Sequence, residues 1–240
     1  FLYFIELMSI SLAKTWDRDR VMAVIQFLPM VLDGPLQAMG KSQLRDSLNH
    51  VGAVADSYRT VSRFSGLVDT LTKEKISSLI TRDPTTRQLN ILEFAAHTLY
   101  FPCEHIAFLI KNGVLKGNAA RIGGLTVFFW FWSLVFGEIR TIYQLLLAYP
   151  YLTPKASDAA SVKRQAEWKR LVLSFIKTTS FLIFSLTCLP AKGKPQLLAN
   201  PSGVLLPLHK TVEVLSPSHL NLPTSIRGIL GLVATLCDFV

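Results

Sequence analysis

Residues 14–34, "KTWDRDRVMAVIQFLPMVLDG", begin with a cluster of charged side chains and then continue almost wholly apolar. The apolar side chains recur at intervals of three and four residues, which predicts an amphipathic helix. Pro29 is expected to kink or interrupt this helix near Gln26 and Phe27, and Gly34-Pro35 is expected to end it. The residues of its apolar face are Val21, Val24, Ile25, Leu28, Val31 and Leu32. Such a helix can pack on its own protein or lie on a membrane, and the rest of the sequence has to decide between the two.

The composition favours the membrane. The 240-residue chain has a mean hydropathy of +0.37, with 50% hydrophobic and only 17% charged residues. Soluble domains carry roughly 25% charged residues, so this chain has little polar material with which to cover a water-facing surface. Helical periodicity dominates and long alternation with period two is absent from the sequence, which predicts an all-α integral membrane protein. A soluble helical domain with an unusually large core is the alternative.

The net charge of +9 calls for an anionic partner. Nucleic acid is disfavoured, because the sequence has no helix-turn-helix, zinc-finger or RNP-like motif, and its aromatic residues crowd into "VFFWFWSLVF" (127–136). An anionic phospholipid membrane is the better partner. Arg18 and Arg20 flank the apolar face of the first helix, where they can reach lipid phosphates while their stems cover hydrocarbon.

The chain divides into regions by polarity. A second amphipathic helix is expected from Ser42 onward, with Leu44, Leu48, Val51, Ala55 and Tyr58 on one side. Residues 171–190 have the length and apolarity of a membrane span, and residues 122–137 are also very apolar. The terminal stretch from Gly228 is too short to span a typical bilayer. We therefore expect an amphipathic membrane-surface region (1–85), apolar helices that are membrane-embedded or interfacial (86–150), a polar basic connector (151–170), a transmembrane helix (171–190), a Pro-rich loop (191–225) and a C-terminal membrane helix (226–240).

Several polar side chains interrupt the apolar segments. They are Glu93, His97, Glu104, His105, Glu138 and Arg140. The sequence contains no H-E-x-x-H, G-x-S-x-G or phosphate-loop motif, so we predict no enzyme activity, no metal site and no cofactor. Pro102 is expected to break the helix between His97 and Glu104. Polar residues within apolar helices either join helices to one another or line a pore.

Four stretches resemble the peroxin-11 family of peroxisomal membrane proteins. "KTWDRDRVMAVIQFLPMVLDG" is similar to the family's N-terminal basic run and the amphipathic helix that follows it, with Gln26-Phe27 in place of Gln-Tyr. "YRTVSRFSGLVDTL" (58–71) matches the family's Ser-Arg segment, although the later Arg is missing. "LYFPCEHIAFLIKNGVL" (99–115) carries Glu104 for Asp and Phe108 for Trp, and "IRGILGLVATLCDF" (226–239) resembles the C-terminal Gly-x-x-Gly segment. The order and spacing of all four agree, and the gamma-type branch is the most similar.

This resemblance implies an integral protein of the peroxisomal membrane whose N-terminal region faces the cytosol. It implies homo-oligomerisation, elongation of the membrane before fission and recruitment of the peroxisomal fission machinery. In this sequence Arg18 and Arg20 would hold headgroups and the apolar face of the first helix would insert. Gly228 and Gly231 of the Gly-x-x-Gly segment would serve self-association.

Three functions remain open from the sequence. The first is membrane remodelling by helix insertion. The second is a small-metabolite pore or transporter of the peroxisomal membrane, which the polar residues within apolar segments suggest. The third is a soluble helical adaptor, which alkaline carbonate would extract from membranes.

Overall fold

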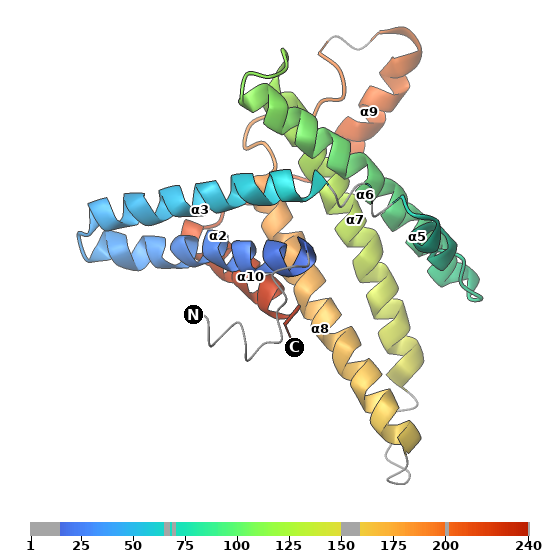
Figure 1. Ribbon diagram of the computed structural model, residues 1–240. Coiled ribbons are helices and arrows are strands. Elements are labelled where there is room, and N and C mark those ends of the chain that lie inside the picture. The colour runs from blue at the N-terminus through green and yellow to red at the C-terminus, as the bar shows by residue number, and fades with distance from the viewer. Residues whose placement is uncertain (1–14, 65–67, 69–70, 150–158, 200–201, 240) are drawn as a thin grey trace.

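The computed structural model describes residues 15–64, 68, 71–149, 159–199 and 202–239 (Figure 1). All regular secondary structure in these residues is helical, which confirms the predicted all-α class. The helices are α2 (Thr15–Ala38), α3 (Ser42–Ser62), α5 (Lys73–Ser78), α6 (Pro84–Lys111), α7 (Ala119–Ala148), α8 (Ala159–Cys188), the short 3-10 helix η2 (Gly203–Leu205), α9 (Leu206–Leu215) and α10 (Thr224–Leu236).

Helices α2 and α3 form an antiparallel hairpin. The turn between them ends α2 through hydrogen bonds from Gly40 N to Gln37 O (3.0 Å) and from Lys41 N to Leu36 O (3.0 Å). Gly40 has a φ of +69°, a left-handed conformation that glycine adopts without steric cost at a helix C-terminus. The expectation that Gly34-Pro35 ends the first helix is therefore wrong, because the helix runs on to Ala38.

Helix α2 also continues through Pro29. The proline is buried in the contact with α3, where its ring faces Gly52. A Cβ at Gly52 would lie 3.2 Å from Gln26 O and 3.6 Å from the Pro29 ring, so the small residue lets the two helices approach closely. Tertiary packing thus holds the proline inside the helix, where its local preference would interrupt it.

Helices α6 and α7 form a second hairpin. Asp83 caps α6 by accepting a hydrogen bond from Thr86 N (2.6 Å), and Asn118 caps α7 by accepting from Arg121 N (3.0 Å). The predicted break at Pro102 is wrong: α6 runs through the proline, which lies on the exposed side of the helix.

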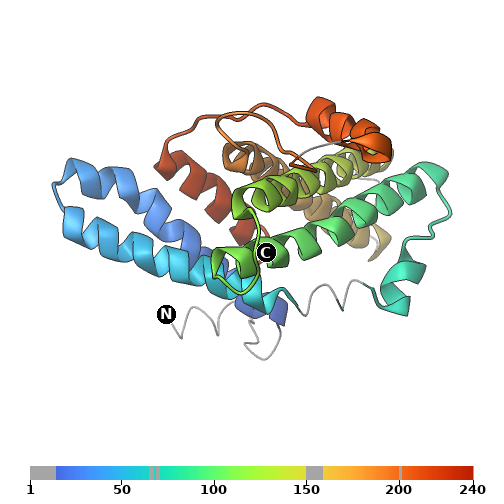
Figure 2. The same ribbon diagram turned by 90° about the horizontal axis from the view of Figure 1, so that it is seen from above.

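Helix α8 runs antiparallel to α7, and α10 packs against both α2 and α8. Figures 1 and 2 show that the α2–α3 hairpin runs crosswise to the long α7–α8 pair. Three helical stretches are long and apolar enough to cross a membrane: Asp17–Ala38 in α2, Ala119–Ala148 in α7 and Val162–Cys188 in α8. The last two include the apolar segments singled out from the sequence.

Two small clusters of buried apolar residues hold these helices together. One joins Ala23 and Phe27 of α2 to Phe184 of α8, and the other joins Leu125 and Phe128 of α7 to Val212 of α9. Helix α9 lies within residues 191–225, where the sequence predicted only a loop. The expected connector 151–170 falls partly outside the described residues, and its described part belongs to the first half of α8.

Candidate membrane interface

Helix α2 has an inward and an outward apolar face. Ala23 and Phe27 are each only 2% exposed and face α8 and α10. The outward face is the one predicted to bind membrane: Leu28 and Leu32 are 45% and 36% exposed. The other four apolar residues predicted for this face, Val21, Val24, Ile25 and Val31, are half-buried. The predicted face is thus only partly exposed, and the backbone at Val31 lies against Gly228 of α10.

Helix α3 adds a second outward apolar stripe to the hairpin. Its exposed members lie three, four or seven residues apart: Leu44, Val51, Val54, Tyr58 and Val61. The sequence placed five residues on this side, but Leu48 is half-buried and Ala55 is buried, which leaves Leu44, Val51 and Tyr58 exposed. Extending the same spacing from Leu44 through Val51 finds Val54 and Val61, which the sequence reading missed.

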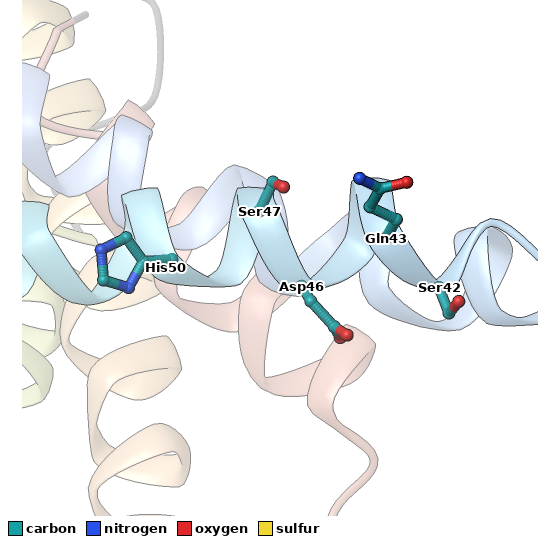
Figure 3. Close-up of a pocket in the computed structure, with 5 residues that line it drawn as sticks. All are labelled: Ser42, Gln43, Asp46, Ser47 and His50. Atoms are coloured by element: carbon teal, nitrogen blue, oxygen red, sulfur yellow. The ribbon is translucent and has the colours of Figure 1, made fainter.

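Beside this stripe, α3 carries a row of polar residues. Figure 3 shows Ser42, Gln43, Asp46, Ser47 and His50 projecting from one side of the helix, where they line a shallow hollow. Polar and apolar strips side by side are the arrangement expected of a helix that lies at the boundary between water and lipid.

A buried ion pair holds the hairpin together. The Nε and Nη2 atoms of Arg59 each donate a hydrogen bond of 3.1 Å to a different carboxylate oxygen of Asp19. Arg59 also donates to Gln26 Oε1 at 2.5 Å, and its guanidinium lies 5.7 Å from the centre of the Phe27 ring. A bidentate pair of this kind fixes the register of two helices as well as their separation.

The two glycines predicted for self-association lie in a contact within the chain. A Cβ at Gly228 would lie 2.5 Å from the backbone nitrogen of Val31, and a Cβ at Gly231 would overlap the Phe27 ring. Both residues are buried. They allow α10 to approach α2 more closely than any larger residue would permit.

The predicted headgroup-binding arginines lie near the N-terminal end of α2. Arg20 pairs with Asp17 (3.1 Å) and lies 3.9 Å from Asp238, which itself accepts a hydrogen bond from Lys177 at 2.6 Å. Arg18 is half-buried on the same helix. Headgroup binding by Arg20 would therefore compete with carboxylates of this chain.

Five of the six polar residues singled out within apolar segments make hydrogen bonds or ion pairs. Arg63 of α3 donates to Glu104 of α6 at 2.7 Å, and Tyr100 donates to the same carboxylate at 2.5 Å. His105 contacts Phe101 O through Nδ1 at 2.6 Å.

Helix α7 makes the equivalent contacts with its two neighbours. Arg140 pairs with Glu93 and donates to Asn90 (2.9 Å), while Glu138 accepts from Thr179 of α8 at 2.5 Å. Together these contacts join α3 to α6, α6 to α7 and α7 to α8. One hollow on α3 and another between α2 and α3 are lined by other residues.

His97, the sixth of these residues, is held uncharged. Its ring stacks on Phe101 with a centroid separation of 5.0 Å, and burial lowers its pKa to about 4. Burial also raises the pKa of Glu104, against the opposing influence of Arg63. Both residues lie on α6, which is not one of the three candidate spans. The described residues contain no group of three or more His, Cys, Asp or Glu side chains able to hold a metal ion.

Comparison with known proteins identifies relatives across most of the chain. A family model described as peroxisomal biogenesis factor 11 (PEX11) matches residues 6–236. The chain is 28% identical to peroxisomal membrane protein 11C of Mus musculus over 152 residues, which cover 61% of this chain and 63% of that protein. It is 29% identical to peroxisomal membrane protein 11C of Homo sapiens over 136 residues, covering 54% and 55%. The chain thus spans less than two thirds of the length of these relatives. No solved structure matches it significantly.

Proposed function

Because the chain belongs to the peroxisomal biogenesis factor 11 family, as its sequence motifs predicted, we propose that it resides in the peroxisomal membrane and promotes peroxisome proliferation. The apolar helices α7 and α8 support an integral location. Both relatives described above carry the name of a peroxisomal membrane protein.

The mechanism we propose is insertion of the α2–α3 hairpin into the cytosolic leaflet. One observation carries it: both helices of the hairpin present outward apolar side chains, and the hairpin runs crosswise to the two helices best suited to span the bilayer. With α7 and α8 upright in the membrane, the hairpin would lie along its surface. A helix in that position buries its apolar face at the boundary between headgroups and acyl chains, which spreads one leaflet and favours curvature.

Self-association would multiply this effect and elongate the membrane before the fission machinery is recruited. Gly228 and Gly231 face α2 of the same chain, so the proposed contact between copies would use other surfaces. Five of the six polar residues that suggested a metabolite pore make hydrogen bonds or ion pairs within the chain, which favours remodelling over a pore.

The test uses the full chain, reconstituted into vesicles of equal parts phosphatidylcholine and phosphatidylserine and viewed by electron microscopy. The wild-type chain should draw vesicles into tubules. Leu28→Glu combined with Leu32→Glu should abolish tubules, because it places two carboxylates in the outward apolar face. The matched control is Gln37→Glu with Gln43→Glu, which adds the same charge at exposed polar positions of the hairpin and should still form tubules. Equal tubulation by both variants would rule out insertion of this face.

A further inference from the structure

Helix α9 has exposed apolar side chains, and it belongs neither to the candidate membrane spans nor to the α2–α3 hairpin. Its inward side is anchored by Val212, which is buried against Leu125 and Phe128 of α7. On the outward side, Leu208 and Val214 are 51% and 76% exposed, and Leu215 is also exposed. On a helical wheel these three side chains spread over an arc of about 120° that ends within about 40° of Val212, and Glu213 lies outside this arc.

Two hydrogen bonds fix the position of α9 relative to the candidate spans. The indole nitrogen of Trp132 in α7 donates to Leu215 O at 3.2 Å, and Lys194 Nζ donates to Glu213 O at 2.9 Å. Lys194 follows the end of α8 by only a few residues. Lysine is typical of the boundary between hydrocarbon and headgroups, whereas Trp132 lies inside the apolar segment 122–137.

The length of α8 indicates where that boundary lies. The apolar part of α8, residues 171–188, would extend about 27 Å as a helix, close to the ~30 Å thickness of a hydrocarbon core. Pro190 and the exposed Lys192 come directly after it. The end of α8, and α9 with it, would therefore lie at one surface of the bilayer.

We propose that α9 is a second membrane-interface helix, which binds anionic phospholipid through Leu208, Val214 and Leu215 together with Lys192, Lys194 and Lys210. The three lysines are exposed, and Glu213 is the one acidic side chain on α9 itself. This charge suits an anionic lipid surface better than a second copy of the same face, which would bring like charges together. The proposal rests on the membrane location proposed above and is independent of tubulation by the hairpin.

The same leaflet would hold α9 and the α2–α3 hairpin. Between Cys188 and Thr224 the described residues contain no helix long enough to cross a membrane, and α10 then packs directly on α2. Figures 1 and 2 place α9 on the opposite side of α7 from the hairpin. Each chain would thus insert helices on two sides of its spanning pair.

Photo-crosslinking of the reconstituted full chain tests this placement. Leu208 and Val214 are replaced, one at a time, by p-benzoylphenylalanine in vesicles of equal parts phosphatidylcholine and phosphatidylserine, and lipid adducts are detected by mass spectrometry. Both positions should yield lipid adducts. Glu213, on the polar side of α9, should yield several-fold fewer. Ile176, exposed on α8, is the positive control for a chain that is correctly embedded.

Two results would overturn the proposal while Ile176 still reacts with lipid. Crosslinked dimers at Leu208 and Val214 would assign the face to a contact between copies, and the absence of lipid adducts at both would place it in water. The lysines are tested by the combined variant Lys192→Gln, Lys194→Gln and Lys210→Gln. It should lower adduct yield several-fold in the anionic vesicles and leave the yield in pure phosphatidylcholine unchanged. An unchanged yield of lipid adducts in both kinds of vesicle would refute the contact between the lysines and anionic headgroups.

Discussion

At the scale of single residues, Arg59 shows that a sequence pattern cannot identify the partner of a charged side chain on another helix. Its position suggests a charged residue on the wet side of α3, yet its side chain is buried against Asp19 of α2. The partners lie 40 residues apart in the sequence, and helical spacing reports only which side of its own helix a residue occupies. The pairing depends on how the hairpin closes, which the local pattern does not contain.

Breaking this pair should destabilise the hairpin. Arg59→Met leaves Asp19 buried without its partner and should lower the free energy of unfolding by about 3–5 kcal/mol. The double variant Arg59→Met with Asp19→Leu removes both charges and should recover most of that loss. Unfolding of the detergent-solubilised chain, followed by circular dichroism in increasing denaturant, measures the difference. Equal stability of wild type and Arg59→Met would contradict the contact.

The cap of α6 predicts a dependence on pH. Hydrogen bonds from Thr86 hold the pKa of Asp83 below its ordinary value, so the folded chain favours the carboxylate. The stabilisation is present above the unfolded pKa of ~4 and is lost as pH falls through the lower folded value. Asp83→Ala should lower the melting temperature by roughly 2–4 °C at neutral pH, because the cap is lost.

Asp83→Asn is the matched variant for this prediction, since asparagine also caps helices but does not titrate. The difference in melting temperature between wild type and Asp83→Ala should shrink below pH ~4. The difference in melting temperature between Asp83→Asn and Asp83→Ala should persist below pH ~4. Thermal scans in detergent above and below pH ~4 check both expectations. If the difference in melting temperature between wild type and Asp83→Ala did not change with pH, the role of the carboxylate would be refuted.

At the scale of elements, periodicity located the helices but misjudged their ends and their partners. The apolar face of the first helix was predictable because its spacing is local, and two of its six residues, Leu28 and Leu32, are exposed. The continuation of α2 past Pro29 was not predictable, since it depends on Gly52 of α3. Gly228 and Gly231 were predicted to serve self-association, whereas the structure places both against α2 of the same chain. Sequence alone could not distinguish a contact within the chain from one between chains.

The contact between α10 and α2 should be intolerant of any larger residue. Gly228→Ala would force a methyl group against the backbone of Met30 and Val31, which cannot give way as a side chain could. We expect α10 to separate from α2, so that Cys237 at its C-terminal end reacts faster with maleimide. Gly123→Ala is the control, because Gly123 also lies in a helix but has nothing within 4 Å of the added carbon.

Gel filtration of the same variants shows whether Gly228 and Gly231 serve a contact within the chain or a contact between copies. Faster labelling of Cys237 with an unchanged oligomeric state would support the contact within the chain. If Gly228→Ala instead dissociated oligomers and left Cys237 as slow to react as in wild type, the glycines would act between copies.

At the scale of the whole molecule, the sequence predicted a helical membrane protein but not its arrangement. Apolar composition and the length of an apolar stretch are properties of single segments, so the helical class and the apolar stretches within α7 and α8 could be predicted from the sequence. The crosswise placement of the α2–α3 hairpin depends on contacts such as Phe27 with Phe184, whose ring centroids lie 5.3 Å apart across distant parts of the chain. Helix α9 was missed because the prolines and lysines around it resemble a loop.

If α7 and α8 anchor the chain, it should resist extraction from membranes by alkaline carbonate, whereas a soluble adaptor would be released. Ile176→Lys combined with Ile183→Lys places two charges in the apolar part of α8, at an insertion cost of roughly 2.5–3.5 kcal/mol each near the bilayer centre, and should increase extraction. Val162→Lys, which adds a charge in the polar first half of α8, should leave the chain in the membrane pellet. The hairpin variant Leu28→Glu with Leu32→Glu should also stay in the pellet, because in the proposed arrangement the hairpin would lie on the membrane and α7 and α8 would hold the chain there. Release of that variant by carbonate would instead make α2 part of the anchor.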